Sequence, residues 1–240
     1  MSEERPKAAG ADRSADSAAA QPEAALAAAP AAWNSRRAWV LLIAVVLVGL
    51  GLDLSSKSAA FRMIGDEPAR LDRSVVVSLP PDQINLLVPR DASMVVIPKL
   101  LNFELVLNPG AVFGVGPGRR WFFIAFTAAA LTFGLWVFAR WTRANQKWAH
   151  VAIGCVIAGG LGNLYDRVVY GCVRDFIHPL PGVPLPFGLK WPSGSPMVWP
   201  WVSNVADALL LFGIGVLVVT LWRSPAGDEI EAAKAESAGA

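Results

Sequence analysis

Two aspartates lie where the chain changes from polar to apolar sequence. Asp175 is in the stretch VRDF, and Asp207 is in NVAD, directly before the run ALLLFGIGVLVV. A carboxylate placed inside such a run is a functional candidate, because its burial is costly. Two aspartates held close together cannot both ionise, so one keeps its proton near neutral pH. The ionised partner can take a proton from water while the protonated one polarises and protonates a scissile amide. The pair therefore predicts metal-free hydrolysis of a peptide bond.

Other polar residues also border the apolar segments of the chain. If the chain crosses a membrane in and out, these residues and the two aspartates fall at one membrane face. Polar side chains that are distant in sequence then meet in one layer, as the residues of a site do. They are Asp53, Lys57, Asn108, Gly110, Asn163, Asp166, Arg167 and Asn204.

Several of these residues also fit purely structural roles. Asp166 and Arg167 fit an ion pair at the end of the third apolar segment, and Asn204 fits an N-cap of the fourth. The glycines of GGLG, at 159–162, are typical of close helix approach in membranes. From the sequence alone, both a structural role and a role in a functional site remain open for these residues.

A metal site is the main chemical alternative. His178, Cys172 and Asp175 carry metal-ligating groups, but they lack an established ligand spacing. The sequence also contains no Ser/His/Asp signature, P-loop or dinucleotide fingerprint. We therefore predict no metal and no cofactor.

The composition indicates a membrane protein. Of the 240 residues, 54% are hydrophobic and only 17% are charged, whereas soluble domains have about 25% charged residues. A net charge of +2 without a basic stripe argues against a nucleic-acid partner. Two cysteines are too few for a disulfide framework. The lipid bilayer is the environment that this composition suits.

Four apolar segments have the length of a transmembrane helix, about 17–25 residues. They cover 37–55, 121–139, 148–164 and 204–222. Polar sequence flanks them, so we expect disordered cytoplasmic tails at 1–34 and 224–240. The prediction is an all-α polytopic membrane protein whose four-helix domain covers 35–223.

The first apolar segment also resembles a signal peptide, because Ser35-Arg36-Arg37 precedes it. However, Asp53 and Lys57 stand where a cleavage site of small residues would be expected. We therefore favour a retained helix.

Basic residues near the segment ends predict the orientation. Arg36 and Arg37 precede the first segment, the short loop between the second and third is basic, and Arg223 follows the fourth. These ends are expected in the cytoplasm. The outer loops then cover about 56–120 and 165–203, and the polar cluster lies at the extracytoplasmic face.

The two outer loops differ in character. The first contains the strand-like runs SVVVSL, INLLV, SMVVI and NFELVLN, the last of which alternates with the period of a half-buried strand. We expect a small extracytoplasmic β element there. Residues 179–201 of the second loop are rich in proline and contain three tryptophans, which predicts an interfacial loop or lid.

Taken in order, these blocks resemble the lipoprotein signal peptidases, the signal peptidase II family of bacterial aspartic proteases. The similarity covers roughly residues 39–222. It consists of Asp53 with Lys57, followed by NPGAVFG, GGLGNLYDR, VRDF and NVAD. No single block is decisive, but five blocks in order across four apolar segments are specific.

The resemblance implies roles for these residues and a substrate. The family's catalytic aspartates fall on Asp175 and Asp207. Asn108, Asn163 and Arg167 match positions that hold the substrate backbone or support the pair. The implied substrate is a prolipoprotein whose cysteine carries diacylglycerol, cut just before that cysteine. The implied enzyme is a multi-pass protein of the bacterial inner membrane, expected as a monomer, with its active site at the extracytoplasmic face.

The chain departs from the family pattern at Pro109, Ser203 and Ala208, and its loops 62–99 and 179–201 are long. These departures affect the expected lid and substrate preference rather than the aspartates. A small polytopic transporter or lipid-binding membrane protein is the alternative. Transporter sites lie near the bilayer midplane in repeated halves, and no repeat is visible in this sequence.

Overall fold

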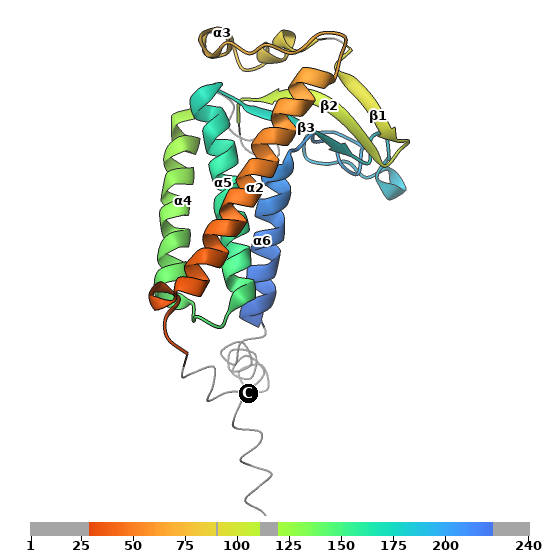
Figure 1. The fold of residues 1–240 in the computed structure, drawn as a ribbon. Helices are drawn as coiled ribbons and strands as arrows, with labels where there is room; N and C mark the ends of the chain where they lie inside the picture. Colours follow the sequence, from red (N-terminus) through yellow and green to blue (C-terminus); the bar gives the residue numbers. More distant parts are fainter. Residues whose placement is uncertain (1–28, 90, 111–119, 223–240) are drawn as a thin grey trace, which may run out of the picture.

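Four long helices form a bundle that has a small sheet and short helical segments at one end (Figure 1). The structure is a computed structural model and describes residues 29–89, 91–110 and 120–222. The long helices are α2 (Arg36–Met63), α4 (Arg120–Trp141), α5 (Lys147–Val169) and α6 (Val205–Trp222). α5 packs against the other three, and it buries more residues than any of them. The bundle is therefore organised around α5.

Glycines allow α5 to approach its neighbours closely. A Cβ on Gly159 would collide with the α6 backbone at Ala206. A Cβ on Gly162 would collide with the Asp53 carboxylate on α2. The structure thus confirms close helix approach at GGLG. Both the start of α6 and the part of α2 that carries Asp53 lie against these glycines.

Two of the helices are longer than predicted. α2 continues past residue 55 to Met63, because Lys57, Ala60 and Phe61 are buried against the sheet end of the bundle. α5 continues past residue 164 to Val169. The first helix therefore extends beyond its predicted end at residue 55, and both Asp53 and Lys57 lie inside it.

The described helices support a multi-pass membrane protein. α2, α4 and α5 are each long and apolar enough to cross a membrane. The apolar part of α6, Val205–Thr220, is shorter. Large apolar side chains on the outside of the bundle are exposed, including Leu47, Phe126 and Leu211. Such an apolar exterior is suited to lipid.

A three-stranded antiparallel sheet lies at one end of the bundle, in the order β1-β2-β3. Its strands are β1 (Ser93–Ile97), β2 (Leu101–Asn108) and β3 (Val173–Pro179). Leu105 and Leu107 alternate along β2 and are buried, in one cluster with Phe61 and Phe176. The predicted small β element is therefore present, and it packs on the end of α2.

Two of the four predicted strand-like runs are helical, and one strand was not predicted. SVVVS belongs to α3 (Arg73–Ser78), where Asp72 caps the helix by accepting a hydrogen bond from Ser74 N at 2.8 Å. INLL forms the 3-10 helix η2 (Ile84–Leu87). Local capping thus overrides the β-branched composition of SVVVS. β3 escaped prediction because charged residues interrupt its apolar pattern, although Val173 to Phe176 are all buried.

The described residues begin inside the segment predicted as an N-terminal tail. The 3-10 helix η1 (Ala32–Asn34) packs beside the α4–α5 turn, where Ala32 N donates to Thr142 O at 2.9 Å. The rest of the two predicted tails, 1–28 and 223–240, lies outside the described residues, as do residue 90 and 111–119.

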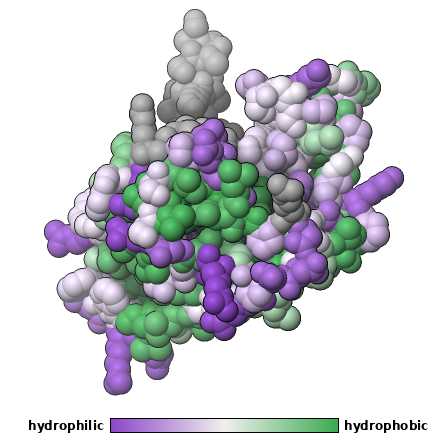
Figure 2. Space-filling model, turned by 90° about the horizontal axis from the view of Figure 1, so that it is seen from above, coloured by the Kyte–Doolittle hydropathy of each residue, from purple (hydrophilic) through white to green (hydrophobic). Residues whose placement is uncertain are grey.

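The end of the molecule that carries the sheet differs from the sides of the bundle. Seen from above, hydrophilic residues surround and separate apolar patches on this face (Figure 2). Most of the charged residues named below lie beneath this face, where the sheet meets α2, α5 and α6.

Candidate active site

Asp175 is held on β3 by two amides from other elements. It lies opposite Val106 of β2 and is almost completely buried. Its Oδ1 accepts from Asn204 Nδ2 at 2.5 Å, and its Oδ2 accepts from Asn108 Nδ2 at 3.0 Å. Both carboxyl oxygens therefore have a fixed donor, which sets the orientation of the carboxyl group.

Asp207 lies in the first turn of α6. Asn204 N donates to Asp207 Oδ2 at 3.1 Å, and Asp207 N donates to Asn204 Oδ1 at 3.1 Å. This reciprocal pair is a capping box at the helix start. Asn163 Nδ2 donates to the other carboxyl oxygen at 2.9 Å. The Asp207 carboxylate thus faces two donors and the positive end of the α6 dipole.

Asn204 connects the two aspartates. Its Oδ1 caps α6 through Asp207 N, while its Nδ2 donates to Asp175 Oδ1. The N-cap role that the sequence left open is therefore present, and it coexists with a role in the polar cluster. One amide side chain fixes the strand aspartate relative to the helix aspartate.

A backbone clamp closes the chain between the two aspartates. Phe176 N and Ile177 N donate to Ser203 O at 2.9 and 2.8 Å, and Ser203 N donates to Ile177 O at 2.8 Å. The clamp lies just after Asp175 and just before Asn204. It therefore joins the part of β3 that follows Asp175 to the residue that precedes Asn204.

The surroundings of Asp175 favour its protonated form. Burial away from water, followed by the charge of nearby Asp207, raises the pKa of the Asp175 carboxyl to about 8. Hydrogen bonds from Asn204 and Asn108 act in the opposite direction. At neutral pH the pair is therefore suited to carry one proton, as the sequence predicts for two close aspartates.

A buried ionic network supports the pair from α2. Lys57 Nζ is fully buried and lies 2.8 Å from Asp53 Oδ2 and 3.4 Å from Asp166 Oδ2. It also donates to Asn163 Oδ1 at 3.0 Å. Because that oxygen accepts from Lys57, the Asn163 amide group presents its Nδ2 to Asp207. Lys57 therefore orients the Asn163 amide that donates a hydrogen bond to Asp207.

Asp53 holds the start of α6 directly. Its Oδ1 accepts from Ala206 N at 2.8 Å, and its Oδ2 accepts from Lys57. Ala206 precedes Asp207, so this bond fixes the position of the first turn of α6. The absence of a Cβ on Gly162 leaves the space that the Asp53 carboxylate occupies.

The ion pair between Asp166 and Arg167, one of the alternatives raised by the sequence, is not formed. Asp166 instead accepts from Arg174 Nη2 at 2.8 Å, Arg174 Nε at 3.2 Å and Arg174 N at 3.0 Å. Arg174 also stacks on the Tyr170 ring, at 4.2 Å from its centroid. Neighbouring residues of a helix point to different sides, which separates Asp166 from Arg167.

Arg167 points toward β2 and α4. Its Nη2 donates to Gly110 O at 2.8 Å, its Nη1 donates to Asn163 O at 3.3 Å, and its guanidinium lies over the Phe123 ring. Asn108 Oδ1 accepts from Gly110 N at 2.9 Å, which links this group to Asp175. Phe113 and the rest of the NPGAVFG block after Gly110 lie outside the described residues.

All ten residues singled out from the sequence therefore join one cluster of hydrogen bonds and ion pairs, which Asp166 enters through its ion pair with Lys57. Arg174 is the member that sequence reasoning missed. Its position next to Asp175 in the sequence could have suggested a role in the cluster. Nothing in the sequence indicated that its side chain would pair with Asp166 of α5. The backbone amide of Ala206 was likewise missed, since an amide has no sequence signature.

An apolar cavity opens beside the cluster between α4, α5 and α6. Its volume is about 380 Å³. Asn163 and Arg167 form its polar end, and aromatic and aliphatic side chains form the rest, among them Phe122, Phe126, Leu131 and Leu210. The cavity thus connects the polar cluster with the apolar exterior of the bundle.

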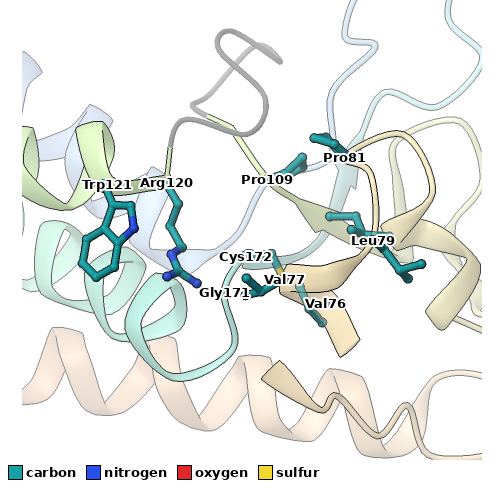
Figure 3. A pocket seen from close by; sticks show the side chains of 10 residues that line it. Val76, Val77, Leu79, Pro81, Pro109, Arg120, Trp121, Gly171 and Cys172 are labelled. Carbon is teal, nitrogen blue, oxygen red and sulfur yellow. The ribbon is translucent and has the colours of Figure 1, made fainter. Parts of the chain in front are cut away.

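A second, smaller cavity lies on the other side of Pro109. It measures about 180 Å³. Figure 3 shows Val76 and Val77 on one side of it, Arg120 and Trp121 of α4 on the other, and Gly171 and Cys172 between them. Pro109 follows Asn108, so this cavity shares a wall with the polar cluster but contains neither aspartate.

The metal-ligand set that the sequence raised as an alternative is not assembled among the described residues. His178 Nδ1 lies 2.9 Å from Glu104 Oε2, away from Cys172. Burial raises the pKa of the Cys172 thiol to about 12, which keeps it protonated and unsuited to bind a metal. Among the described residues, no three His, Cys, Asp or Glu side chains are grouped so that they could hold a metal ion.

Comparison with known proteins identifies the family of this chain. Residues 43–223 match the family model of signal peptidase (SPase) II. The chain belongs to the signal peptidase II family. A lipoprotein signal peptidase of Desulfitobacterium hafniense is 35% identical over 130 residues, which cover 54% of this chain and 74% of the relative. One of a Methylobacterium species is 31% identical over 183 residues, covering 74% and 94%.

A solved structure supports the same conclusion for the fold. A bacterial membrane enzyme determined by the in meso method at 2.3 Å resolution superposes with a TM-score of 0.53. It is 27% identical to this chain, with 76% of this chain and 87% of the other covered. The match to the signal peptidase II family model covers α2 from residue 43 onward, the other three long helices and the sheet, so it includes every residue of the cluster.

Proposed function

We propose that this signal peptidase II removes signal peptides from diacylglyceryl-modified prolipoproteins by cutting just before the lipid-modified cysteine, with Asp175 and Asp207 as its catalytic pair. The family is that of an aspartic-type signal peptidase that processes lipoprotein precursors. The observation that carries the assignment of the site is the single Asn204 side chain that links both aspartates. No other pair of carboxylates among the described residues is joined in this way next to an apolar cavity.

The geometry suggests how the two carboxyl groups divide the work. Asp175 has a pKa raised to about 8, so it is suited to hold the shared proton. We assign the ionised share of the pair to Asp207, because it accepts a hydrogen bond from a backbone amide at the start of α6. Asp207 then takes a proton from the attacking water, and Asp175 protonates the leaving nitrogen. The water oxygen bonds to the scissile carbonyl carbon as it loses this proton, and the C–N bond then breaks as the nitrogen gains one. The products are a carboxylate on the signal peptide and an amine on the cysteine.

The apolar cavity is suited to bind the hydrophobic parts of this substrate. Both the signal peptide and the diacylglyceryl group are apolar, and the cavity beside the pair is lined mostly by aromatic and aliphatic side chains. Arg167 and Asn163 stand where the cavity meets the polar cluster. They are placed to bind carbonyl oxygens of the substrate backbone, in the role that the family resemblance suggests.

The first experiment compares a diacylglyceryl-modified precursor with its unmodified form. Purified enzyme in lipid vesicles is expected to cleave the modified precursor and to leave the unmodified one largely intact, because the lipid holds the scissile bond at the membrane surface. Mass spectrometry of the products locates the cut. Equal rates for both forms, or a cut elsewhere than before the cysteine, would contradict the proposed substrate.

We further propose that all four long helices span the bacterial inner membrane, with the aspartates at the extracytoplasmic face. The basic residues Arg36, Arg37, Arg140 and Arg143 lie at the end of the bundle opposite the sheet. Cytoplasmic loops carry an excess of such residues. The predicted tails and the monomeric state stay predictions.

Cysteine labelling tests this orientation. Ser193→Cys and Asn145→Cys introduce thiols at exposed positions, while the native Cys155 and Cys172 are buried. A membrane-impermeant maleimide should label Ser193→Cys in intact spheroplasts, and Asn145→Cys only after permeabilisation. The reverse pattern would place the aspartates in the cytoplasm, and labelling of both in intact cells would rule out four spans.

A further inference from the structure

The chain between β3 and α6 forms a closed hairpin that the proposed chemistry does not use. Val198 N donates to Val183 O at 2.8 Å, and Leu185 N donates to Pro196 O at 2.6 Å. At the turn of the hairpin, Trp191 N donates to Ser195 O at 2.9 Å. The hairpin, residues 183–198, is thus tied together along its length. Residues 186–190, between the last two of these hydrogen bonds, are called its tip below.

The tip presents large apolar side chains to the outside. It contains the 3-10 helix η4 (Pro186–Gly188). Phe187 is 98% exposed, and Leu189 is 59% exposed. Phe187 also has a φ of 59°, a left-handed conformation that is unfavourable for an aromatic residue. A fixed backbone therefore holds an aromatic ring away from the rest of the protein, where the described structure offers it no contact.

The composition around the tip suits an anionic lipid surface. Residues 179–203 contain no aspartate and no glutamate, and their charged residue is Lys190, next to Leu189. Trp191, Trp199 and Trp201 pack edge to face behind the tip, with ring centroids 4.8 and 5.8 Å apart along the group. Tryptophan and lysine beside exposed apolar residues are typical of segments that lie in a membrane interface.

The position of the hairpin in the fold is consistent with such a contact. In Figure 1 the segment after β3 lies on the side of the sheet that faces the helices, beside the upper end of α6, and η4 is at its outer extremity. The bilayer around α6 would begin at this level. The hairpin tip is therefore directed to the place where lipid headgroups would lie.

We infer that hairpin 183–198 is a second membrane contact, in which Phe187 and Leu189 enter the lipid leaflet and Lys190 lies at the phosphate level. The inference rests on the proposed placement of the helices in the membrane. If this inference holds, the hairpin rests on lipid and supports the sheet that carries Asp175 from the side opposite α2. The hairpin would hold the sheet at a fixed height above the bilayer, where a lipid-anchored substrate presents its scissile bond.

Fluorescent labelling at three positions tests this contact. An environment-sensitive nitrobenzoxadiazole probe is attached to Phe187→Cys, to Ser193→Cys on the exposed face of the same hairpin, and to Phe126→Cys, an exposed position on α4. The enzyme is reconstituted in vesicles of phosphatidylcholine and phosphatidylglycerol that contain nitroxide-labelled lipid. Quenching at residue 187 is expected to be about threefold stronger than at residue 193, with emission shifted to the blue, because only the tip enters the leaflet.

The controls separate the possible failures. If residue 126 is quenched and residue 187 is not, the hairpin contact is wrong while the membrane placement of α4 holds. If residue 126 is also unquenched, the membrane placement itself fails. A probe at residue 187 that is shielded from both lipid nitroxides and aqueous iodide would indicate a protein contact and would also overturn the inference.

A substitution gives an independent readout. Phe187→Asn with Leu189→Ser removes the apolar tip, and Asn tolerates the left-handed backbone at position 187. The doubly substituted enzyme is expected to show a KM for vesicle-bound precursor raised several-fold with little change in kcat, because the catalytic cluster is untouched. An unchanged KM in vesicles would count against the contact, and thermal unfolding would verify that the variant is folded.

Discussion

Asp175→Asn and Asp207→Asn are each expected to reduce precursor cleavage by a factor on the order of 10⁴ or more. Asn is nearly the same size as Asp, but it can neither take a proton from water nor give one to the leaving amine. The double variant should lose little further activity, because residues that act as one unit are strongly non-additive. Single-turnover cleavage of diacylglyceryl-modified precursor measures the effect.

The same variants should remain folded. Asn at position 175 keeps one oxygen for Asn204 or Asn108, so the expected loss of stability is about 1 kcal/mol for one weakened hydrogen bond. Asp72→Asn is the matched control, since Asp72 caps α3 at the surface and lies outside the cluster. Substantial turnover by a folded Asp175→Asn or Asp207→Asn enzyme would refute the assigned pair.

The pH dependence provides a second readout of the same pair. Activity should fall at low pH, where both carboxyl groups are protonated, and fall again above about pH 8, where the pair loses its shared proton. Stability has a defined sign as well. The folded state holds a proton on Asp175 between its ordinary pKa of 3.8 and about 8, so stability declines as pH rises through this window. Asp175→Asn should flatten that decline, which thermal unfolding at several pH values would show.

Asp166→Ala is expected to lower the free energy of unfolding by about 3–5 kcal/mol, because it leaves a buried cation without its partner. The stranded group is the guanidinium of Arg174, a residue that is 4% exposed and whose side chain makes two hydrogen bonds to Asp166. Lys57 loses a carboxylate at 3.4 Å as well. Activity should decrease in parallel, since Arg174 adjoins Asp175. Equilibrium unfolding in detergent measures the change.

A double substitution distinguishes the ion pair from a simple loss of packing. Asp166→Leu with Arg174→Met replaces both charges by apolar groups, and it should recover much of the stability lost in Asp166→Ala. Asp91→Ala is the control, because its carboxylate accepts an exposed hydrogen bond from Asp66 N. If Asp166→Ala were as stable as Asp91→Ala, the network would have no structural role.

The sequence predicted the parts of this molecule that have a periodic or compositional signal. The apolar segments gave the four long helices, and the alternation in NFELVLN gave β2. The polar residues at the segment ends gave the members of the cluster, because a chain that passes back and forth brings alternate ends together. These features depend on local sequence and on the period of each element.

The remaining features depend on contacts between distant elements. SVVVS is helical because Asp72 caps it, and α2 continues to Met63 because the sheet covers Phe61. The partner of Asp166 is Arg174 rather than the adjacent Arg167, since β3 passes beside the end of α5. Which of two arginines pairs with Asp166 depends on how β3 packs against α5. A single sequence does not reveal that packing.

The backbone clamp between Ile177 and Ser203 closes the segment between them into a loop whose length can change without moving its ends. Because the clamp and Asn204 fix both aspartates from outside the hairpin, its length is not transmitted to their spacing. Doubling a closed loop adds only about 0.6 kcal/mol of closure entropy. The segment can therefore change in length without a change in the spacing of the acid pair, so an affinity tag or a foreign recognition loop can be inserted there without rebuilding the pair.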